Sequence, residues 1–166
     1  MERVDRGQPF GVVIDYAHTP SSLQAVLDIL APIAAARGGG LIAVFGSAGE
    51  RDTDKRPMMG RIAAERARLV VVTDEDPRGE DREAILDEIA RGAETAGARR
   101  GHDLLLVADR PAAIEAAFER ARAGDVVLLA GKGHEQSIIG PGGPVAYDER
   151  KIALDALARL GHVGGG

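Results

Sequence analysis

The segment DEDPR at residues 74–78 places three carboxylates and one guanidinium close together. It follows residues 69–73, which are apolar and mostly β-branched, a pattern typical of a parallel strand buried on both faces. Open α/β sheets bind ligands in the crevice outside the carboxyl ends of their strands. The segment therefore indicates a substrate-reading loop, although an acidic turn closed by Pro77 would have the same composition.

Three further polar clusters also follow apolar runs. DYAHTP at residues 15–20 brings a carboxylate and an imidazole to a helix start, where they could contact a hydroxyl or a phosphate. Residues 46–57 form a glycine-containing loop with three cations that runs into a helix, an arrangement that favours a carboxylate or phosphate ligand. GKGHE at residues 131–135 allows close backbone approach and offers a cation, a titratable ring and an acceptor for an ammonium group.

Each cluster also has a purely structural explanation. His18 could be a local hydrogen-bond partner at its helix start, and residues 46–57 could be a solvated loop with internal ion pairs. That loop is not a P-loop, because no glycine is followed by GKS or GKT at the required spacing. No HxxxH or HExxH spacing supports metal binding by His18 and His134, so we expect no metal site. The shared position of the four clusters after strands favours one ligand site.

Strands alternate with helices along the chain. Apolar runs predict strands at residues 11–15, 41–45, 69–73, 104–107 and 126–130. Helical patterns begin near Pro20, Pro57 and Pro111, and a last helix follows Asp148. This βαβ series predicts a three-layer α/β/α Rossmann-like domain with a mostly parallel sheet of about six strands. The Gly/Pro segment 140–144 predicts a hairpin-like turn and one antiparallel edge strand near residues 145–147.

Composition narrows the classes of function. With 166 residues and 45% hydrophobic content, the chain fits one domain with a sizeable core. A net charge of −5 and only 3% aromatic residues argue against a nucleic-acid surface. The absence of cysteine excludes disulfides, thiolate zinc sites and cysteine nucleophiles. No apolar run reaches the ~20 residues that span a bilayer, and the start does not read as a signal peptide, so we expect a cytoplasmic protein without membrane partners.

Together the four clusters resemble the C-terminal domain of the Mur ligases, the ATP-dependent amide ligases that build the peptidoglycan stem peptide. The matching segments are DYAHTP, VFGSAGERDTDKRPMMG, TDEDPR and AGKGHE, with Asp109-Arg110 and Asp148-Glu149 as weaker matches. The resemblance covers nearly the whole chain and is closest to the members that add the third amino acid. It implies that residues 1–163 form this domain, that residues 164–166 are a disordered tail, and that an N-terminal UDP-sugar domain and a central ATPase domain lie outside the chain.

The resemblance also implies roles for individual residues. Asp15 matches the acidic residue that reaches across the domain interface to ATP, whereas ATP and Mg²⁺ are bound mainly by the absent central domain. The positions that hold the incoming amino acid correspond to Arg51, Glu75, Asp76, Arg78, Gly131 and Glu135, with Tyr16, Lys132 and His134 as further candidates. The domain's contribution would be positioning, and His18 and His134 are candidates for proton transfer.

The implied reaction activates the D-glutamyl carboxylate of UDP-MurNAc-L-Ala-D-Glu as an acyl phosphate, which the amine of a diamino acid then attacks. In diaminopimelate-adding relatives the loop reads DNPR. Its arginine grips the distal carboxylate, and the residue at Glu135, with the backbone at Gly131, holds the distal ammonium. Asp76 replaces the asparagine and favours an ammonium, whereas the retained Arg78 favours diaminopimelate. We expect diaminopimelate, with lysine or ornithine as alternatives, and an isolated domain without activity.

Two other functions fit a similar sheet. A receiver-like signalling domain would use Asp15, Asp74 and Lys132, but it needs an adjacent acidic pair where Tyr16 stands. A noncatalytic ligand-binding α/β module is the other alternative.

Overall fold

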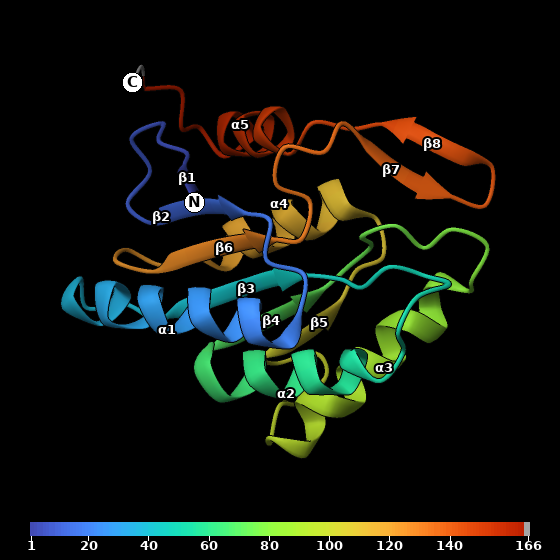
Figure 1. Cartoon of the computed structure of the whole chain (residues 1–166). Coiled ribbons are helices and arrows are strands. Elements are labelled where there is room, and N and C mark those ends of the chain that lie inside the picture. The colour runs from blue at the N-terminus through green and yellow to red at the C-terminus, as the bar shows by residue number, and fades with distance from the viewer. Residues whose placement is uncertain (165–166) are drawn as a thin grey trace.

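The chain forms one sheet between two helical layers in the computed structural model, which describes residues 1–164 (Figure 1). The main sheet has the strand order β1-β2-β6-β3-β4-β5. Its strands are β1 (Glu2–Arg3), β2 (Gly11–Asp15), β3 (Leu41–Phe45), β4 (Leu69–Val72), β5 (Leu104–Leu106) and β6 (Val126–Ala130). The helices are α1 (Pro20–Ala36), α2 (Lys55–Arg66), α3 (Arg82–Thr95), α4 (Arg110–Arg120) and α5 (Glu149–Arg159). The predicted three-layer α/β/α class is confirmed.

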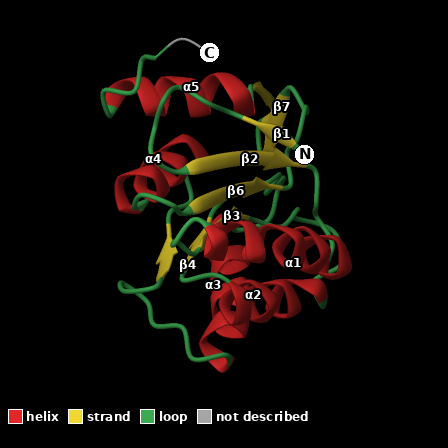
Figure 2. Ribbon diagram, turned by 90° about the vertical axis from the view of Figure 1, so that its left-hand side faces the viewer, coloured by secondary structure: helices red, strands yellow, loops and turns green. Residues whose placement is uncertain are grey.

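Alternate residues of each central strand pack against opposite helical layers. In β3, Leu41 and Phe45 belong to the core shared with α1, α2 and α3, whereas Ile42 and Val44 belong to the core shared with α4 and α5. Figure 2 shows these two groups of helices on opposite sides of the sheet. Because both faces are covered, the central strands are continuous apolar runs without polar alternation.

The antiparallel strand of the main sheet lies elsewhere than predicted. It is β1, which pairs with β2 so that Glu2 lies opposite Ile14. Residues 145–147 overlap instead with β8 (Gly143–Ala146), which pairs with β7 (Ser137–Gly140) in a separate two-stranded sheet. The predicted hairpin turn and the single antiparallel edge strand of the main sheet are confirmed. The predicted position of that strand near residues 145–147 is wrong, because the tight turn pairs β7 and β8 with each other.

Side-chain caps fix where the helices begin. Thr19 accepts a hydrogen bond from the backbone N–H of Ser22, and Asp81, Asp109 and Asp148 cap α3, α4 and α5 in the same way. The second predicted helix begins at Lys55, two residues before Pro57. No helix among residues 1–164 is long and apolar enough to cross a membrane.

The chain end meets the segment after β1. The backbone N–H of Gly164 donates to the carbonyl of Arg6. Of the tail that we expected to be disordered, residues 165 and 166 lie outside the described residues.

Candidate functional site

The three carboxylates of residues 74–78 turn in different directions. Asp74 accepts hydrogen bonds from Arg82 on α3, while Asp76 pairs with Lys132 after β6. Glu75 faces Gly131. Burial raises the pKa of Asp74, although Arg82 opposes this shift. The loop thus has two sides. Asp74 faces Arg82 on one side, and Glu75 and Asp76 face Gly131 and Lys132 on the other.

A chain of contacts joins four of the sequence-predicted residues. The Lys132 ammonium donates to Asp76 at 2.8 Å and to Glu135 at 2.9 Å, and the Tyr16 hydroxyl donates to the other Glu135 oxygen at 2.9 Å. Lys132 is fully buried, so its charge is balanced by these two carboxylates inside the protein. Tyr16 is 51% exposed, and its hydrogen bond to Glu135 raises its pKa. These contacts link the loops after β2, β4 and β6.

Glu75 is a buried carboxylate with an unused oxygen. The residue is 8% exposed, and its Oε2 has no hydrogen-bond partner among the described residues. A Cβ added to Gly131 would lie 3.3 Å from this oxygen. Burial raises the pKa of Glu75, and the nearby Lys55, Arg110 and Lys132 oppose the shift. A buried acceptor without a partner is costly unless a ligand satisfies it.

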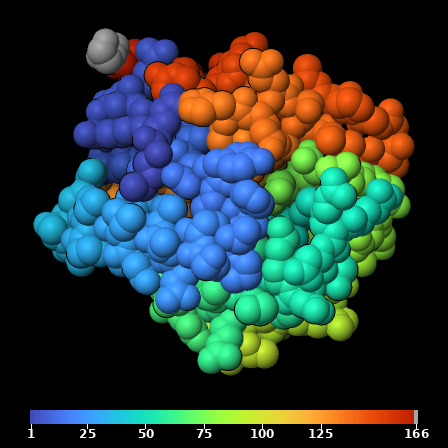
Figure 3. Space-filling model, viewed as in Figure 1, coloured from blue at the N-terminus to red at the C-terminus, as the bar shows by residue number. Residues whose placement is uncertain are grey.

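The β7–β8 hairpin is fastened to the same loop at one residue. Ile139 of β7 donates its N–H to the Asp76 carboxylate, and its carbonyl accepts from the backbone N–H of Arg78, both at 2.8 Å. Arg78 has a φ of 55°, in the left-handed region that non-glycine residues rarely adopt, and its buried Nε has no partner among the described residues. Figure 3 shows the hairpin, in orange, projecting beside the green residues that follow β4. The hairpin therefore holds the side chain of Asp76 and the backbone of Arg78.

Two glycines allow the loop after β3 to pack against the loop after β4. A Cβ on Gly46 would lie 2.1 Å from the carbonyl oxygen of Thr73, and one on Gly49 would lie 2.0 Å from that of Pro77. The backbone N–H of Gly49 also donates to the Asp76 carbonyl at 2.7 Å. These close approaches explain why this polar loop contains glycine at both positions.

The three cations of residues 46–57, one in the loop after β3 and two in the first turn of α2, have different environments. Arg56 is fully buried and donates to Glu80 and Glu88, so it stabilises the loop internally. Lys55 donates to the carbonyl of His18 at 2.9 Å. Arg51 is exposed, and no side-chain hydrogen bond or ion pair joins it to other described residues. The expectation of three ligand-facing cations is therefore wrong for Arg56, whose charge pairs with carboxylates inside the protein.

The remaining predicted residues lie at the edge of this cluster. Asp15 accepts a hydrogen bond from the N–H of Ala17, and its own carbonyl accepts from the N–H of Gly131. His18 lies beside Tyr16 with a distance of 4.7 Å between ring centroids. The His134 side chain is 88% exposed and has only a 3.7 Å approach to Glu2. The geometry therefore places neither histidine beside Glu75 or Asp76.

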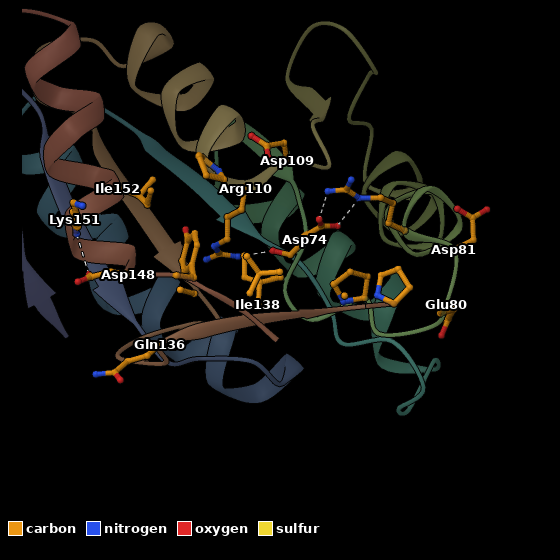
Figure 4. Close-up of a pocket in the computed structure, with 18 residues that line it drawn as sticks. Asp74, Glu80, Asp81, Asp109, Arg110, Gln136, Ile138, Asp148, Lys151 and Ile152 are labelled. Carbon is orange, nitrogen blue, oxygen red and sulfur yellow. Dashed lines mark hydrogen bonds and ion pairs between the residues drawn. The ribbon is translucent and has the colours of Figure 1, made fainter. Parts of the chain in front are cut away.

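A cavity of about 950 Å³ lies on the Asp74 side of the loop. Figure 4 shows side chains from the starts of α3, α4 and α5 and from the hairpin around it, including Asp81, Asp109, Asp148 and Ile138. Glu75, Asp76 and the glycines after β6 do not line it. The cavity is thus separate from the cluster of predicted substrate-binding residues around Glu75, Asp76 and Gly131. Asp74 and Pro77 face the cavity, on the other side of the same loop.

Sequence reasoning gave little weight to a buried ion pair behind the site. Arg110 and Glu149 are each 1% exposed and form a bidentate pair, with Nη2 of Arg110 2.6 Å from Oε2 of Glu149. Tyr147 donates its hydroxyl to the same carboxylate. The sequence offered a helix start and a weaker family match at each position, but nothing local indicates that two helix N-termini far apart in the chain will meet.

Nucleotide and metal chemistry has little support from these residues alone. Residues 1–164 contain no group of three histidine, aspartate or glutamate side chains placed to hold one metal ion. Asp15 is the one residue for which the family resemblance implies contact with ATP.

Comparison with known proteins supplies the family. Residues 1–133 match the family described as "Mur ligase, glutamate ligase domain". The UDP-N-acetylmuramyl-tripeptide synthetase of Roseiflexus sp. (strain RS-1) is 55% identical over 164 residues, which are 99% of this chain and 32% of that protein. The UDP-N-acetylmuramoyl-L-alanyl-D-glutamate–2,6-diaminopimelate ligase of Syntrophomonas wolfei is 42% identical over 156 residues, covering 94% of this chain and 31% of that protein.

A solved structure agrees with these relatives. The structure of a UDP-N-acetylmuramoyl-L-alanyl-D-glutamate–2,6-diaminopimelate ligase matches with a TM-score of 0.83 and 34% identity, over 98% of this chain and 32% of that one. The chain thus spans about a third of the length of these relatives. On this sequence and structural agreement, the chain belongs to the Mur ligase family and corresponds to its glutamate ligase domain.

Proposed function

We propose that this domain binds the incoming amino acid of a peptidoglycan ligase that joins a diamino acid to UDP-MurNAc-L-Ala-D-Glu. The ATP-dependent reaction forms an acyl phosphate and releases ADP. The amino acid is meso-diaminopimelate, with lysine and ornithine as the alternatives. The enzyme acts in the cytoplasm, and the domain works with the UDP-sugar and ATPase domains of the longer protein.

The observation that carries this proposal is a pair of unused groups in one loop. Arg78 has a buried Nε without a partner, and Glu75 has a buried carboxylate oxygen without one, in the described part of the chain. The distal end of diaminopimelate carries a carboxylate and an ammonium, which match a guanidinium and a carboxylate. Lysine and ornithine carry only the ammonium and would leave Arg78 unpaired. The loop therefore offers complementary charges for a zwitterionic end.

Internal pairing of Asp76 also supports the diaminopimelate assignment. A free carboxylate beside Arg78 would repel the distal carboxylate of the substrate. Lys132 lies 2.8 Å from Asp76 and offsets its charge, and Ile139 donates to the same oxygen. Arg78 can then pair with the substrate although the sequence has aspartate where the diaminopimelate pattern has asparagine.

Glu135, Gly131 and Tyr16 complete the proposed amino-acid site. The Tyr16 hydroxyl donates to Oε1 of Glu135 and thereby holds this carboxylate in place for an incoming ammonium. Gly131 has a φ of 107°, and a side chain at this position would crowd Glu75, because its Cβ would lie 3.3 Å from Oε2 of Glu75. Arg51 is exposed and stays available for a carboxylate of the substrate. Asp15 extends the site towards ATP and Mg²⁺, which the central ATPase domain binds.

The receiver-like alternative loses its main structural support. That function needs the cation after the last parallel strand to face the acidic residue at an earlier strand end. Lys132 pairs with Asp76 and Glu135, while Asp74 pairs with Arg82. The family match leads away from a signalling domain as well.

The test uses the full-length ligase with UDP-MurNAc-L-Ala-D-Glu, ATP, Mg²⁺ and each diamino acid separately. We expect ADP and a tripeptide product of the mass that diaminopimelate gives. The 166 residues alone should produce neither, because they lack an ATPase domain. Product formation by this chain alone, or no product from the full-length protein with any of the three amino acids, would refute the proposal.

A further inference from the structure

Arg110 joins two strand ends that are not neighbours in the sheet. Its Nη1 donates to the carbonyl of Asp74 and its Nη2 donates to the carbonyl of Ala130, both at 2.9 Å. Asp74 follows β4 and Ala130 ends β6, and β3 lies between these strands. Figure 4 shows Arg110 reaching from α4 to Asp74 along the wall of the cavity. One planar guanidinium therefore fixes the separation of two backbone segments.

Both segments lead directly into the amino-acid site. Glu75 follows Asp74, and Gly131 follows Ala130. These two residues face each other, since a Cβ on Gly131 would lie 3.3 Å from the Glu75 carboxylate. Arg110 itself lies behind them and has almost no exposed surface. A change in its two carbonyl contacts would alter the spacing of Glu75 and Gly131 without removing a group that faces the substrate.

The arginine is itself firmly held. Its Nε donates to Glu149 at 3.0 Å, and its Nη2 also donates to that carboxylate at 2.6 Å. Burial disfavours the charged guanidinium, but Glu149 more than offsets this and raises the pKa of Arg110. The group therefore stays charged throughout the pH range in which enzymes work, with its fork fixed in one orientation.

We propose that Arg110 is a positioning residue of the ligase: it sets the spacing between Glu75 and Gly131 through the carbonyls of Asp74 and Ala130. The substrate meets the two segments that Arg110 holds and never touches Arg110. This role rests on the proposed function. It predicts that changes at Arg110 alter the KM for the diamino acid more than the KM values for the other two substrates.

A matched control exists at the other end of the same two strands. Arg68 precedes β4 and donates to Asp125, which precedes β6, and to the carbonyl of Arg120. This arginine also joins β4 to β6 across β3, but at their amino ends, away from the site. Loss of Arg68 should also lower stability, although by less than loss of the fully buried Arg110, and it should leave the spacing of Glu75 and Gly131 unchanged.

The experiment compares Arg110→Lys, the double variant Arg110→Met/Glu149→Met and the control Arg68→Lys in the full-length ligase. In Arg110→Lys, the lysine keeps a positive charge near Glu149 but lacks the planar guanidinium that binds two carbonyls at once. The double variant replaces a buried ion pair by apolar side chains, a change that proteins often tolerate. We expect both Arg110 variants to raise the KM for the diamino acid on the order of tenfold or more, because small displacements of positioning groups are costly. The KM values for ATP and UDP-MurNAc-L-Ala-D-Glu should change little, and Arg68→Lys should leave all three near wild type.

Activity of the wild type is measured first, since its absence would contradict the proposed function and not the role of Arg110. With an active wild type, an unchanged KM for the diamino acid in a folded Arg110 variant would overturn the positioning role. An equal rise for ATP, or an equal effect of Arg68→Lys, would do the same. If neither Arg110 variant folds, the arginine is a requirement of the fold and the positioning role is also rejected.

Discussion

The Lys132 ammonium and the Asp76 carboxylate form a contact of 2.8 Å in which the lysine has no exposed surface. The pair makes the last acidic residue of the segment 74–78 an internal partner of the loop after β6. Ile139 of the hairpin shares the same carboxylate oxygen, so the contact also fastens β7 to the site. The charge next to Arg78 is therefore governed by folding as well as by the residue type at position 76.

Asp76→Asn should shift the amino-acid preference towards diaminopimelate. The asparagine oxygen can still accept from Ile139, but one negative charge near the substrate's distal carboxylate disappears. We expect the ratio of kcat/KM for diaminopimelate to that for lysine to rise on the order of fivefold, the size of one partly screened charge contact.

The control for this change is Asp74→Asn, in the same loop but facing Arg82 and the cavity. It should leave the ratio near the wild-type value. An Asp76→Asn enzyme whose ratio stays constant or falls would show that Asp76 has no part in selecting the amino acid.

Glu75→Gln should alter stability in a pH-dependent way. Burial raises the pKa of Glu75, so the folded state holds its proton to higher pH than the unfolded state does. The stabilisation from the protonated carboxyl is complete below the unfolded value of about 4.3 and is lost as pH rises through the folded pKa. Glutamine cannot ionise and keeps the neutral state at every pH.

We therefore expect the melting temperature of Glu75→Gln to exceed that of the wild type at pH 8 and the difference to shrink towards pH 4. Thermal unfolding of both proteins across this range measures it. A difference that grows on acidification would mean that Glu75 is stabilised as an anion. In the full-length enzyme the same variant should weaken diamino-acid binding, since an amide cannot pair with an ammonium as a carboxylate does.

Tyr16→Phe should have a small, local effect. The change removes the hydroxyl that holds Oε1 of Glu135 at 2.9 Å but keeps the aromatic ring beside His18 and Gly133. Because Tyr16 is half exposed, we expect the loss of this hydrogen bond to weaken diamino-acid binding by about 1 kcal/mol or less. The KM for the diamino acid should rise about threefold. The melting temperature should stay within about 2 °C of wild type. A large loss of kcat with an unchanged KM would instead place Tyr16 in the chemical step.

The fold was largely predictable because its signals are local. Residues 41–45 and 126–130 are apolar without interruption, as strands covered on both faces must be. Thr19, Asp109 and Asp148 mark helix starts through short-range capping. The antiparallel strand was misplaced because β1 has only two residues and no sequence period of its own.

The composition of the candidate site was predictable, but the pairing inside it was not. The four polar clusters could be recognised because each follows a strand, and parallel strands bring their carboxyl ends to one edge. Which charges neutralise each other depends on distant packing. Arg56 reaches Glu80 and Glu88, and Arg110 reaches Glu149 across 39 positions. No local sequence pattern distinguishes arginines that form such internal ion pairs from Arg78, whose Nε has no partner among the described residues.

A competition assay tests the proposal that the loop at residues 74–78 selects a diamino acid with a zwitterionic end, and the claim is decided by the products. The full-length ligase and its Arg78→Ala variant receive equal concentrations of diaminopimelate, lysine and ornithine, and mass spectrometry measures the ratio of tripeptide products. We predict mainly the diaminopimelate product from the wild type. The variant should lose most of that preference, with a KM for diaminopimelate raised far more than that for ATP. Mainly lysine or ornithine product from the wild type, or an unchanged product ratio in Arg78→Ala, would contradict the claim.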